Sequence, residues 1–128
     1  MTQILLVAIG GALGAVARYG AGVTAVRLFG SGGWPWGTFG VNLIGGLLIG
    51  LITGWIAFKG QAYSETVRLF AVVGVLGGFT TFSAFSLEVV QMLERREMAT
   101  AALYALASVI LSVVAVFVGL TVMRKVFG

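Results

Sequence analysis

The sequence contains no cysteine and no histidine, and only one of its 128 residues is proline. Without cysteine and histidine there are no disulfides, no thiol catalysis and few of the common metal ligands, and the histidine-based enzyme designs are excluded. Charged residues make up only 9% of the chain, against about a quarter in ordinary soluble domains. No glycine loop of the nucleotide-hydrolysing kind is present either. We therefore expect a protein that is not an enzyme and has no ATPase of its own.

Hydrophobic residues, by contrast, make up 59% of the chain. A soluble domain of this size could not bury so much apolar surface, because small domains bury a smaller fraction of their surface. We expect an all-α membrane protein solvated by the lipid bilayer. The net charge of +4 then indicates anchors that flank the membrane rather than a nucleic-acid partner.

Four stretches are long enough to cross the hydrocarbon core, which needs about 20 apolar residues. A single four-helix transmembrane domain over residues 1–128 is therefore predicted, with no segment left for a soluble domain. The expected spans are residues 4–23, 38–58, 67–90 and 100–123. Small residues recur at four-residue spacing within them, as in Gly10 and Gly14, which favours close helix packing.

The third expected span holds an unusual stretch, Gly77-Gly78-Phe79-Thr80-Thr81-Phe82-Ser83-Ala84-Phe85-Ser86. Glycine destabilises a helix. Threonine and serine side chains can hydrogen-bond backbone groups that have lost their helical partners. We predict a break in this helix near mid-membrane. Such breaks are tolerated only where protein or a water-filled path covers them, so this stretch is the first candidate site.

Basic residues divide evenly between the two expected sides of the membrane, four against four. Orientation follows the Lys and Arg bias of short loops, so the chain carries almost no orientation signal. One hypothesis is insertion in both directions and pairing as an antiparallel dimer. The other is that a buried Arg18 does not count and a weak bias survives.

Polar side chains within the spans are costly and tend to mark pathways. Tyr104, Ser108 and Ser112 share one face of the fourth span, and Asn42 lies one turn from Thr38 in the second. The third span adds Thr80 and Thr81, and all of these side chains can donate hydrogen bonds. The electropositive edges of Phe82 and Phe85, three residues apart, could add further donors. Together, these hydrogen-bond donors favour a path for a small, partly dehydrated anion.

Each of these features has a plainer interpretation. Intramembrane serine and threonine usually bond their own helix, and lipid-facing phenylalanine usually packs. Arg18 either snorkels to the interface or forms a positive vestibule that attracts anions. A proton-coupled exporter would need a carboxylate deep within a span, and Glu88, near the end of the third span, is the one weak candidate.

The broken stretch closely resembles the corresponding motif of the small bacterial fluoride channels, the Fluc family. So does Gly37-Thr38-Phe39-Gly40-Val41-Asn42-Leu43-Ile44-Gly45-Gly46, together with the opening Gly10–Arg18 and the Tyr104, Ser108, Ser112 stripe. The resemblance covers essentially the whole chain. It implies a dual-topology, antiparallel homodimer in the bacterial plasma (inner) membrane.

The resemblance also implies two fluoride pathways per dimer and a central structural sodium ion, bound by the backbone carbonyls of Gly77 and Thr80. Arg18 is then the vestibule residue. The pathway residues that it implies are Asn42, Phe82, Phe85, Thr38, Tyr104, Ser108, Ser112 and Thr81.

The expected function is passive, fluoride-selective export that protects the cell from fluoride. A dimeric small multidrug exporter is the alternative from the coupled-transporter class, disfavoured because the first span has no acid. An accessory membrane subunit without transport is the third hypothesis, and the polar stripe and the broken third span argue against it.

Overall fold

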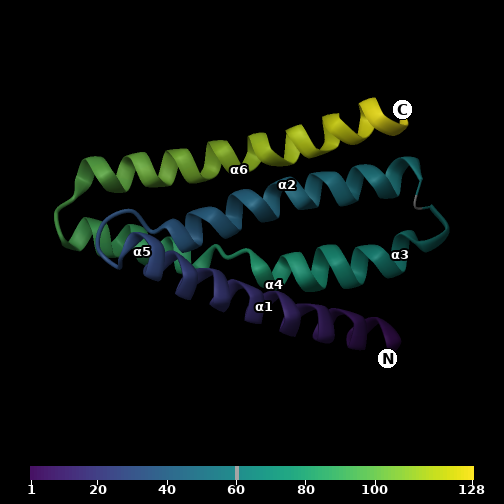
Figure 1. The fold of residues 1–128 in the computed structure, drawn as a ribbon, viewed down its shortest axis with the longest axis horizontal. Helices are drawn as coiled ribbons and strands as arrows, with labels where there is room; N and C mark the ends of the chain where they lie inside the picture. Colours follow the sequence, from purple (N-terminus) through teal and green to yellow (C-terminus); the bar gives the residue numbers. More distant parts are fainter. Residues whose placement is uncertain (60) are drawn as a thin grey trace.

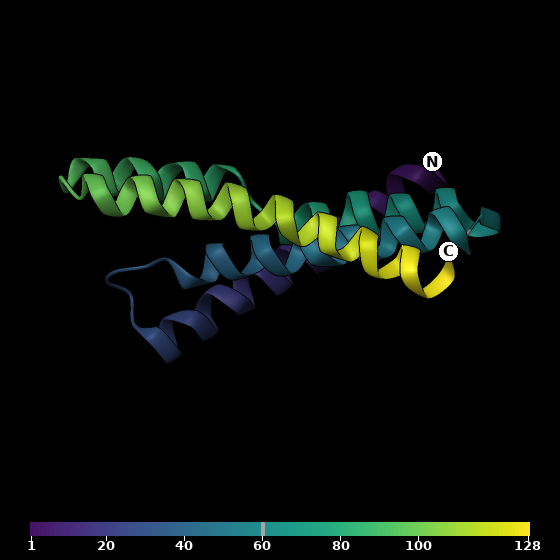
Figure 2. The same ribbon diagram turned by 90° about the horizontal axis from the view of Figure 1, so that it is seen from above.

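The computed structural model describes residues 1–59 and 61–128, and these form an all-helical bundle. Four helices in it are long and apolar enough to cross a membrane, as the sequence predicts: α1 (Thr2–Phe29), α2 (Trp36–Phe58), a composite third helix (Ser64–Glu94) and α6 (Met98–Phe127). Figure 1 shows α2 beside α6, and α1 beside α4 of the third helix. Both chain termini lie at the same end of the bundle (Figures 1 and 2).

The helices extend beyond the stretches expected from hydropathy. The first continues from the expected Val23 to Phe29 and stops at Gly30, whose φ of 82° suits glycine. Helical hydrogen bonding can continue past the hydrocarbon core into the headgroup region, so apolar length underestimates helix length. A short turn of charged residues, Arg95 to Glu97, joins α5 to α6, and Arg96 in it adopts a positive φ of 61°.

The third helix is a composite of different windings. After a short 3₁₀ turn η1 (Gln61–Tyr63), it runs through α3 (Ser64–Val67), the π-helix η2 (Arg68–Leu76) and α4 (Gly77–Phe79), and resumes as α5 (Ser83–Glu94). The helix already begins at Ser64, three residues before the expected start of the third span at residue 67. Gly60 lies outside the described residues.

A break separates α4 from α5. Residues 80–82 leave the helix, and Thr80 is extended, with φ −84° and ψ 160°. This confirms the predicted break and places it in the middle of the Gly77–Ser86 stretch. The π-helix of nine residues that precedes it was not predicted from the sequence.

Glycines bring two pairs of helices into backbone contact. A Cβ on Gly10 would lie 2.5 Å from the carbonyl oxygen of Phe70 and 3.0 Å from Cα of Gly74, so α1 packs directly on η2. A Cβ on Gly119 would meet the backbone of Leu47 at 2.6 Å, so α6 packs as closely on α2. The small residues therefore serve helix packing, as expected.

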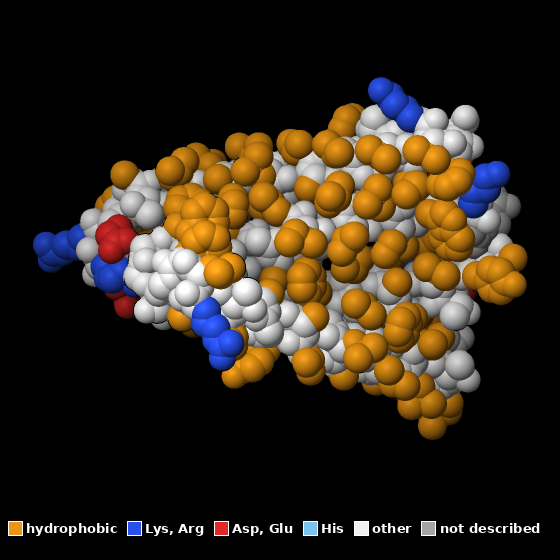
Figure 3. Space-filling model, in the orientation of Figure 1, with side chains coloured by type: hydrophobic (Ala, Val, Ile, Leu, Met, Phe, Trp, Pro, Cys, Tyr) orange, Lys and Arg blue, Asp and Glu red, His pale blue; other side chains and the backbone are white. Residues whose placement is uncertain are grey.

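Hydrophobic side chains cover most of the surface. The buried cluster in one chain consists only of Phe85, Met92, Ala101 and Tyr104. In Figure 3 hydrophobic side chains cover the middle of the visible face, and charged side chains gather toward its ends. A soluble monomer rarely exposes so large an apolar surface, whereas a lipid-facing bundle does.

Candidate ion pathway at the helix break

Asn42 of α2 holds the break in place. Its Nδ2 donates to the carbonyl oxygen of Thr81 at 2.9 Å, and its Oδ1 accepts from the Thr81 N–H at 2.8 Å. One side-chain amide therefore replaces the helical partners of both backbone groups of Thr81. The amide keeps one further N–H free to donate.

The break diverts donors away from two backbone carbonyls. In an α-helix the carbonyl of Gly77 would accept from the N–H of Thr81, which here donates to Asn42. The carbonyl of Thr80 would accept from the N–H of Ala84, which donates instead to Oγ1 of Thr81 at 3.1 Å. Within the described residues, neither carbonyl has another donor among the hydrogen bonds at the break. They are the two carbonyls expected to bind sodium.

Other hydroxyl groups at the break bond the local backbone. Thr80 Oγ1 donates to the carbonyl of Leu76 at 2.9 Å, and Ser86 Oγ donates to the carbonyl of Phe82 at 2.9 Å. The plainer interpretation of serine and threonine therefore holds for these two side chains.

A hollow of about 460 Å³ lies beside the break, and we call it the break hollow. It brings together most of the residues predicted for the pathway. Its lining includes Asn42, Gly77, Thr80, Thr81, Phe82, Phe85, Ser108 and Ser112. The Phe82 and Phe85 ring centroids are 5.6 Å apart. Phe85 is buried, whereas Phe82, at the edge of the break hollow, is 75% exposed.

Two serine hydroxyls in the break hollow have no partner. The Oγ atoms of Ser108 and Ser112 are buried and make no hydrogen bond within the described part of the chain. A buried hydroxyl without a partner is unfavourable, and such groups call for a functional or solvent partner. They stand ready to donate to a small anion or a water molecule.

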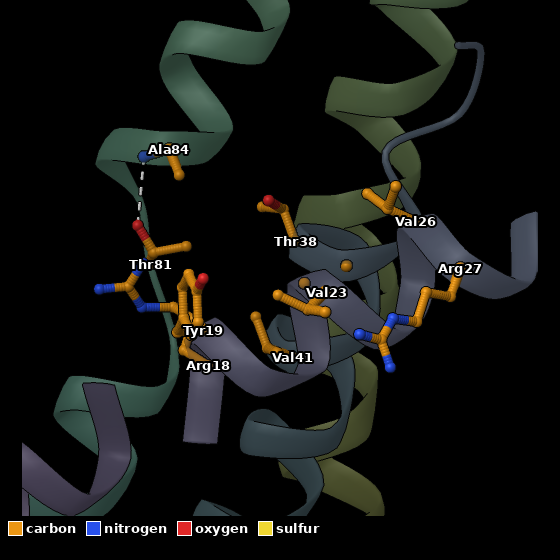
Figure 4. Close-up of a pocket in the computed structure, with 11 residues that line it drawn as sticks. Arg18, Tyr19, Val23, Val26, Arg27, Thr38, Val41, Thr81 and Ala84 are labelled. Atoms are coloured by element: carbon orange, nitrogen blue, oxygen red, sulfur yellow. Dashed lines mark hydrogen bonds between the residues drawn. The ribbon is translucent and has the colours of Figure 1, made fainter. Parts of the chain in front are cut away.

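A second hollow, of about 570 Å³, lies on the other side of the break, between α1, α2 and α5; we call it the arginine hollow. Figure 4 shows Arg18 extending toward Thr81, with Arg27 across the hollow and Thr38 in its wall. The Nε atom of Arg18 donates to the carbonyl oxygen of Gly78 at 3.1 Å, so the side chain does not snorkel to a helix end.

Glu88 joins two of the predicted residues, and sequence reasoning did not place it in the pathway. Its two carboxylate oxygens accept from Thr38 Oγ1 and from the Tyr104 hydroxyl, each at 2.9 Å. Tyr104 is fully buried, so it lines neither of the two hollows directly. The positions 38, 88 and 104 are far apart in sequence, and only their polarity within apolar helices could have signalled the cluster.

The two hollows offer hydrogen-bond donors and positive charge. No acidic side chain is among the residues lining either of them. Arginine, amide N–H, hydroxyl and ring-edge groups all favour a small anion over a cation. The free carbonyls of Gly77 and Thr80 are the exception, because they favour a hard cation.

Comparison with known proteins agrees with this geometry. The family described as CrcB-like protein, Camphor Resistance (CrcB), matches residues 5–120. A protein named fluoride-specific ion channel FluC from Caulobacter sp. (strain K31) is 61% identical over all of this chain and 99% of its own length. Proteins with the same name from Phenylobacterium zucineum (strain HLK1) and Caulobacter vibrioides (strain NA1000 / CB15N) are 56% and 54% identical over the full length of both chains.

These relatives, together with the four apolar helices, identify the chain as a multi-pass protein of the bacterial inner membrane. They also confirm the resemblance noted in the sequence: the chain belongs to the family of CrcB-like proteins, whose similar members carry the name of fluoride channels.

Proposed function

We propose that this protein is a passive, fluoride-selective channel that lets fluoride leave the cytoplasm. The break hollow is the observation that carries the proposal, because its described lining gathers Asn42, Ser108 and Ser112 with two phenylalanine rings and includes no acid. Such donors replace water around a small anion better than around a larger one such as chloride. An inside-negative potential releases about 2.3 kcal/mol per charge for each 100 mV, so no ATP is needed.

The working unit that we propose is an antiparallel homodimer with two pathways. The near-even basic residues support it: with Arg18 held at the break and left out of the count, four lie on one side against three on the other, so the orientation bias stays small. The exposed position of Phe82 at the rim of the break hollow supports it too, because a second chain would enclose this ring. Thiol labelling of Thr2→Cys in whole cells tests dual insertion, and labelling of only one population would contradict it.

The central sodium ion is also a proposal, and the residues present fit it. The carbonyls of Gly77 and Thr80 have lost their helical donors, and unwound carbonyls are typical ligands of a hard cation. A bound sodium ion would supply positive charge that satisfies these carbonyls. We expect the dimer to be thermally less stable when sodium is replaced by N-methylglucamine, and no change in stability would contradict the proposal.

Glu88 gives little support to the exporter alternative. Both of its oxygens accept hydrogen bonds, from Thr38 and from Tyr104. The hollow that Glu88 lines is a separate one of about 200 Å³, between α1, α2 and the turn that joins them, and not the break hollow or the arginine hollow. A carboxylate that exchanges a proton for a lipophilic cation would have to give up both partners to bind the cation there.

The test of the proposed function is fluoride release from liposomes that hold the purified protein, followed with a fluoride electrode. We expect fast release that requires a potassium ionophore as charge shunt, with little chloride release in a matched run. Protein-free liposomes are the control. Absence of fluoride release from protein shown to be dimeric would overturn the proposal.

A further inference from the structure

Arg18 lies on the face of α1 that packs against the break. Gly11, Ala15 and Arg18 follow one another at helical spacing on this face. A Cβ on Gly78 would lie 2.5 Å from the carbonyl oxygen of Gly11 and 3.1 Å from the backbone nitrogen of Ala15. This close packing brings the Arg18 side chain within reach of the first carbonyls of the break.

The carbonyl of Gly78 is one of those whose helical donor is lost. Its partner in an α-helix would be the N–H of Phe82, which lies within the break itself. Arg18 Nε donates to this oxygen at 3.1 Å, across 60 residues of sequence. The neighbouring carbonyl of Gly77 has no such donor among the described residues.

We propose that Arg18 is a positioning residue: its Nε–H holds the Gly78 carbonyl on the α1 side of the break and so fixes the direction of the Gly77 and Thr80 carbonyls. Asn42 holds the other end of the break from α2 through Thr81. Two helices thereby hold the break, α1 at Gly78 and α2 at Thr81. The Gly77 carbonyl lies directly before the first contact and the Thr80 carbonyl directly before the second, and neither accepts a hydrogen bond at the break within the described residues.

This role is distinct from attraction of anions by the charge of Arg18. A guanidinium carries five N–H donors, and the structure uses only Nε within residues 1–59 and 61–128. The Nη groups make no hydrogen bond among these residues, and Figure 4 shows them on the side of Arg18 that faces away from Arg27. The positioning role depends on an N–H at one place in the side chain, whereas attraction depends on charge alone.

Two substitutions distinguish the effect of the N–H donor at Nε from the effect of the positive charge of Arg18. Arg18→Gln removes the charge but keeps an N–H at the position of Nε, because the glutamine amide nitrogen, like the Nε atom of arginine, is the fourth side-chain atom after Cα. Arg18→Lys keeps the charge but puts a methylene group there. Arg27→Lys and Arg27→Gln are the matched controls, since Arg27 lines the same hollow and makes no hydrogen bond to the break among the described residues.

A single carbonyl signal can report the contact directly. The dipeptide Gly-Phe occurs once in the sequence, at Gly78-Phe79. Labelling glycine with ¹³C at its carbonyl and phenylalanine with ¹⁵N therefore selects the Gly78 carbonyl alone in a solid-state NMR spectrum of the full-length protein in lipid. The chemical shift of a carbonyl carbon responds to the loss of its hydrogen bond.

We expect the Gly78 resonance to move in Arg18→Lys and to stay near its original position in Arg18→Gln and in both Arg27 controls. An unmoved resonance in Arg18→Lys overturns the proposal. So does a resonance in Arg18→Gln displaced as far as in Arg18→Lys. If Arg18→Lys does not fold, Arg18→Gln is compared with Arg18→Met, because both lack the charge and only glutamine has the donor.

The positioning role of Arg18 rests on the proposed function only where it predicts an effect on fluoride release. We expect Arg18→Lys to reduce fluoride release at least fivefold more than Arg18→Gln. If the unaltered protein releases no fluoride, the proposed function fails while the Gly78 resonance still decides the role of Arg18.

Discussion

The break hollow and the arginine hollow meet at one helix break but differ in how they would attract an anion. The arginine hollow has two guanidinium groups in its wall, and the described residues of the break hollow include none. Among the described residues, only Thr81 lines both. Long-range charge attracts a hydrated anion, whereas close donors replace its water, so we expect the two hollows to fail in different ways when altered.

The largest effect is expected from Asn42→Asp. A carboxylate at this position would face the carbonyl oxygen of Thr81 in place of the Nδ2 donor. A buried mismatch of this kind costs about 3 kcal/mol, which corresponds to a loss of about 100-fold in fluoride release. Liposome release measures it. Asn42→Leu, which removes the bonds without adding charge, should lose less, and equal release from all three proteins would contradict the role of Asn42.

Phe82→Ile and Phe85→Ile should each lower fluoride release by about tenfold, the equivalent of ~1.4 kcal/mol, because each removes a ring edge from the break hollow. Their effects on stability should differ. Phe85 belongs to the buried cluster, so its substitution should also cost about 1–2 kcal/mol of stability, whereas Phe82 is 75% exposed within the chain.

Thermal unfolding of the two variants measures their packing separately from their conduction. Both variants should elute at the same size as the unaltered protein, with only Phe85→Ile melting clearly earlier. Unchanged fluoride release in both variants would remove ring edges from the mechanism.

Gly45→Ala should distort the break from the side of α2. The added Cβ would overlap Cγ2 of Thr80, and Phe79 Cδ2 lies 3.6 Å from the same point. Overpacking of this kind costs about 1–3 kcal/mol, and we expect a several-fold loss of fluoride release. Gly40→Ala in the same helix is the control, because its Cβ would meet nothing within 4 Å in the chain. Equal melting temperatures of the two variants would contradict the contact.

The smallest effect is expected from Arg27→Gln in the arginine hollow. Arg27 is exposed, so its charge acts through solvent and is screened by salt. Fluoride release should fall about twofold at 10 mM salt, where the Debye length is about 30 Å, and the difference should vanish near 1 M. A deficit that persists at high salt would mean that Arg27 acts by contact.

The sequence predicts the four helices and the break because both depend on local composition. The length of an apolar stretch identifies a span. Adjacent glycines and threonines in the middle of a span identify a place where the helical hydrogen bonds are interrupted. The grouping of Asn42, Ser108 and Ser112 in one hollow also agrees with their helical spacing.

Other features depend on which segments meet in space. The π-helix over Arg68–Leu76 lies in an ordinary apolar run, and it packs closely on α1. The contact of Arg18 with Gly78 spans 60 residues, and that of Thr38 with Glu88 spans 50. No local sequence pattern specifies such partners, because each arginine or carboxylate in a span could form hydrogen bonds with several different groups.

If fluoride passes through the break hollow, a bulky group attached to a single thiol in that hollow should block it. The chain has no cysteine, so Ser112→Cys carries a unique site within that hollow, and Thr2→Cys carries one at the chain end. Each protein is modified with a bulky methanethiosulfonate reagent, checked by intact mass and dimer elution, and reconstituted for fluoride release. We predict that modification blocks release through Ser112→Cys and leaves Thr2→Cys unaffected. Full release from completely modified Ser112→Cys protein would contradict the account.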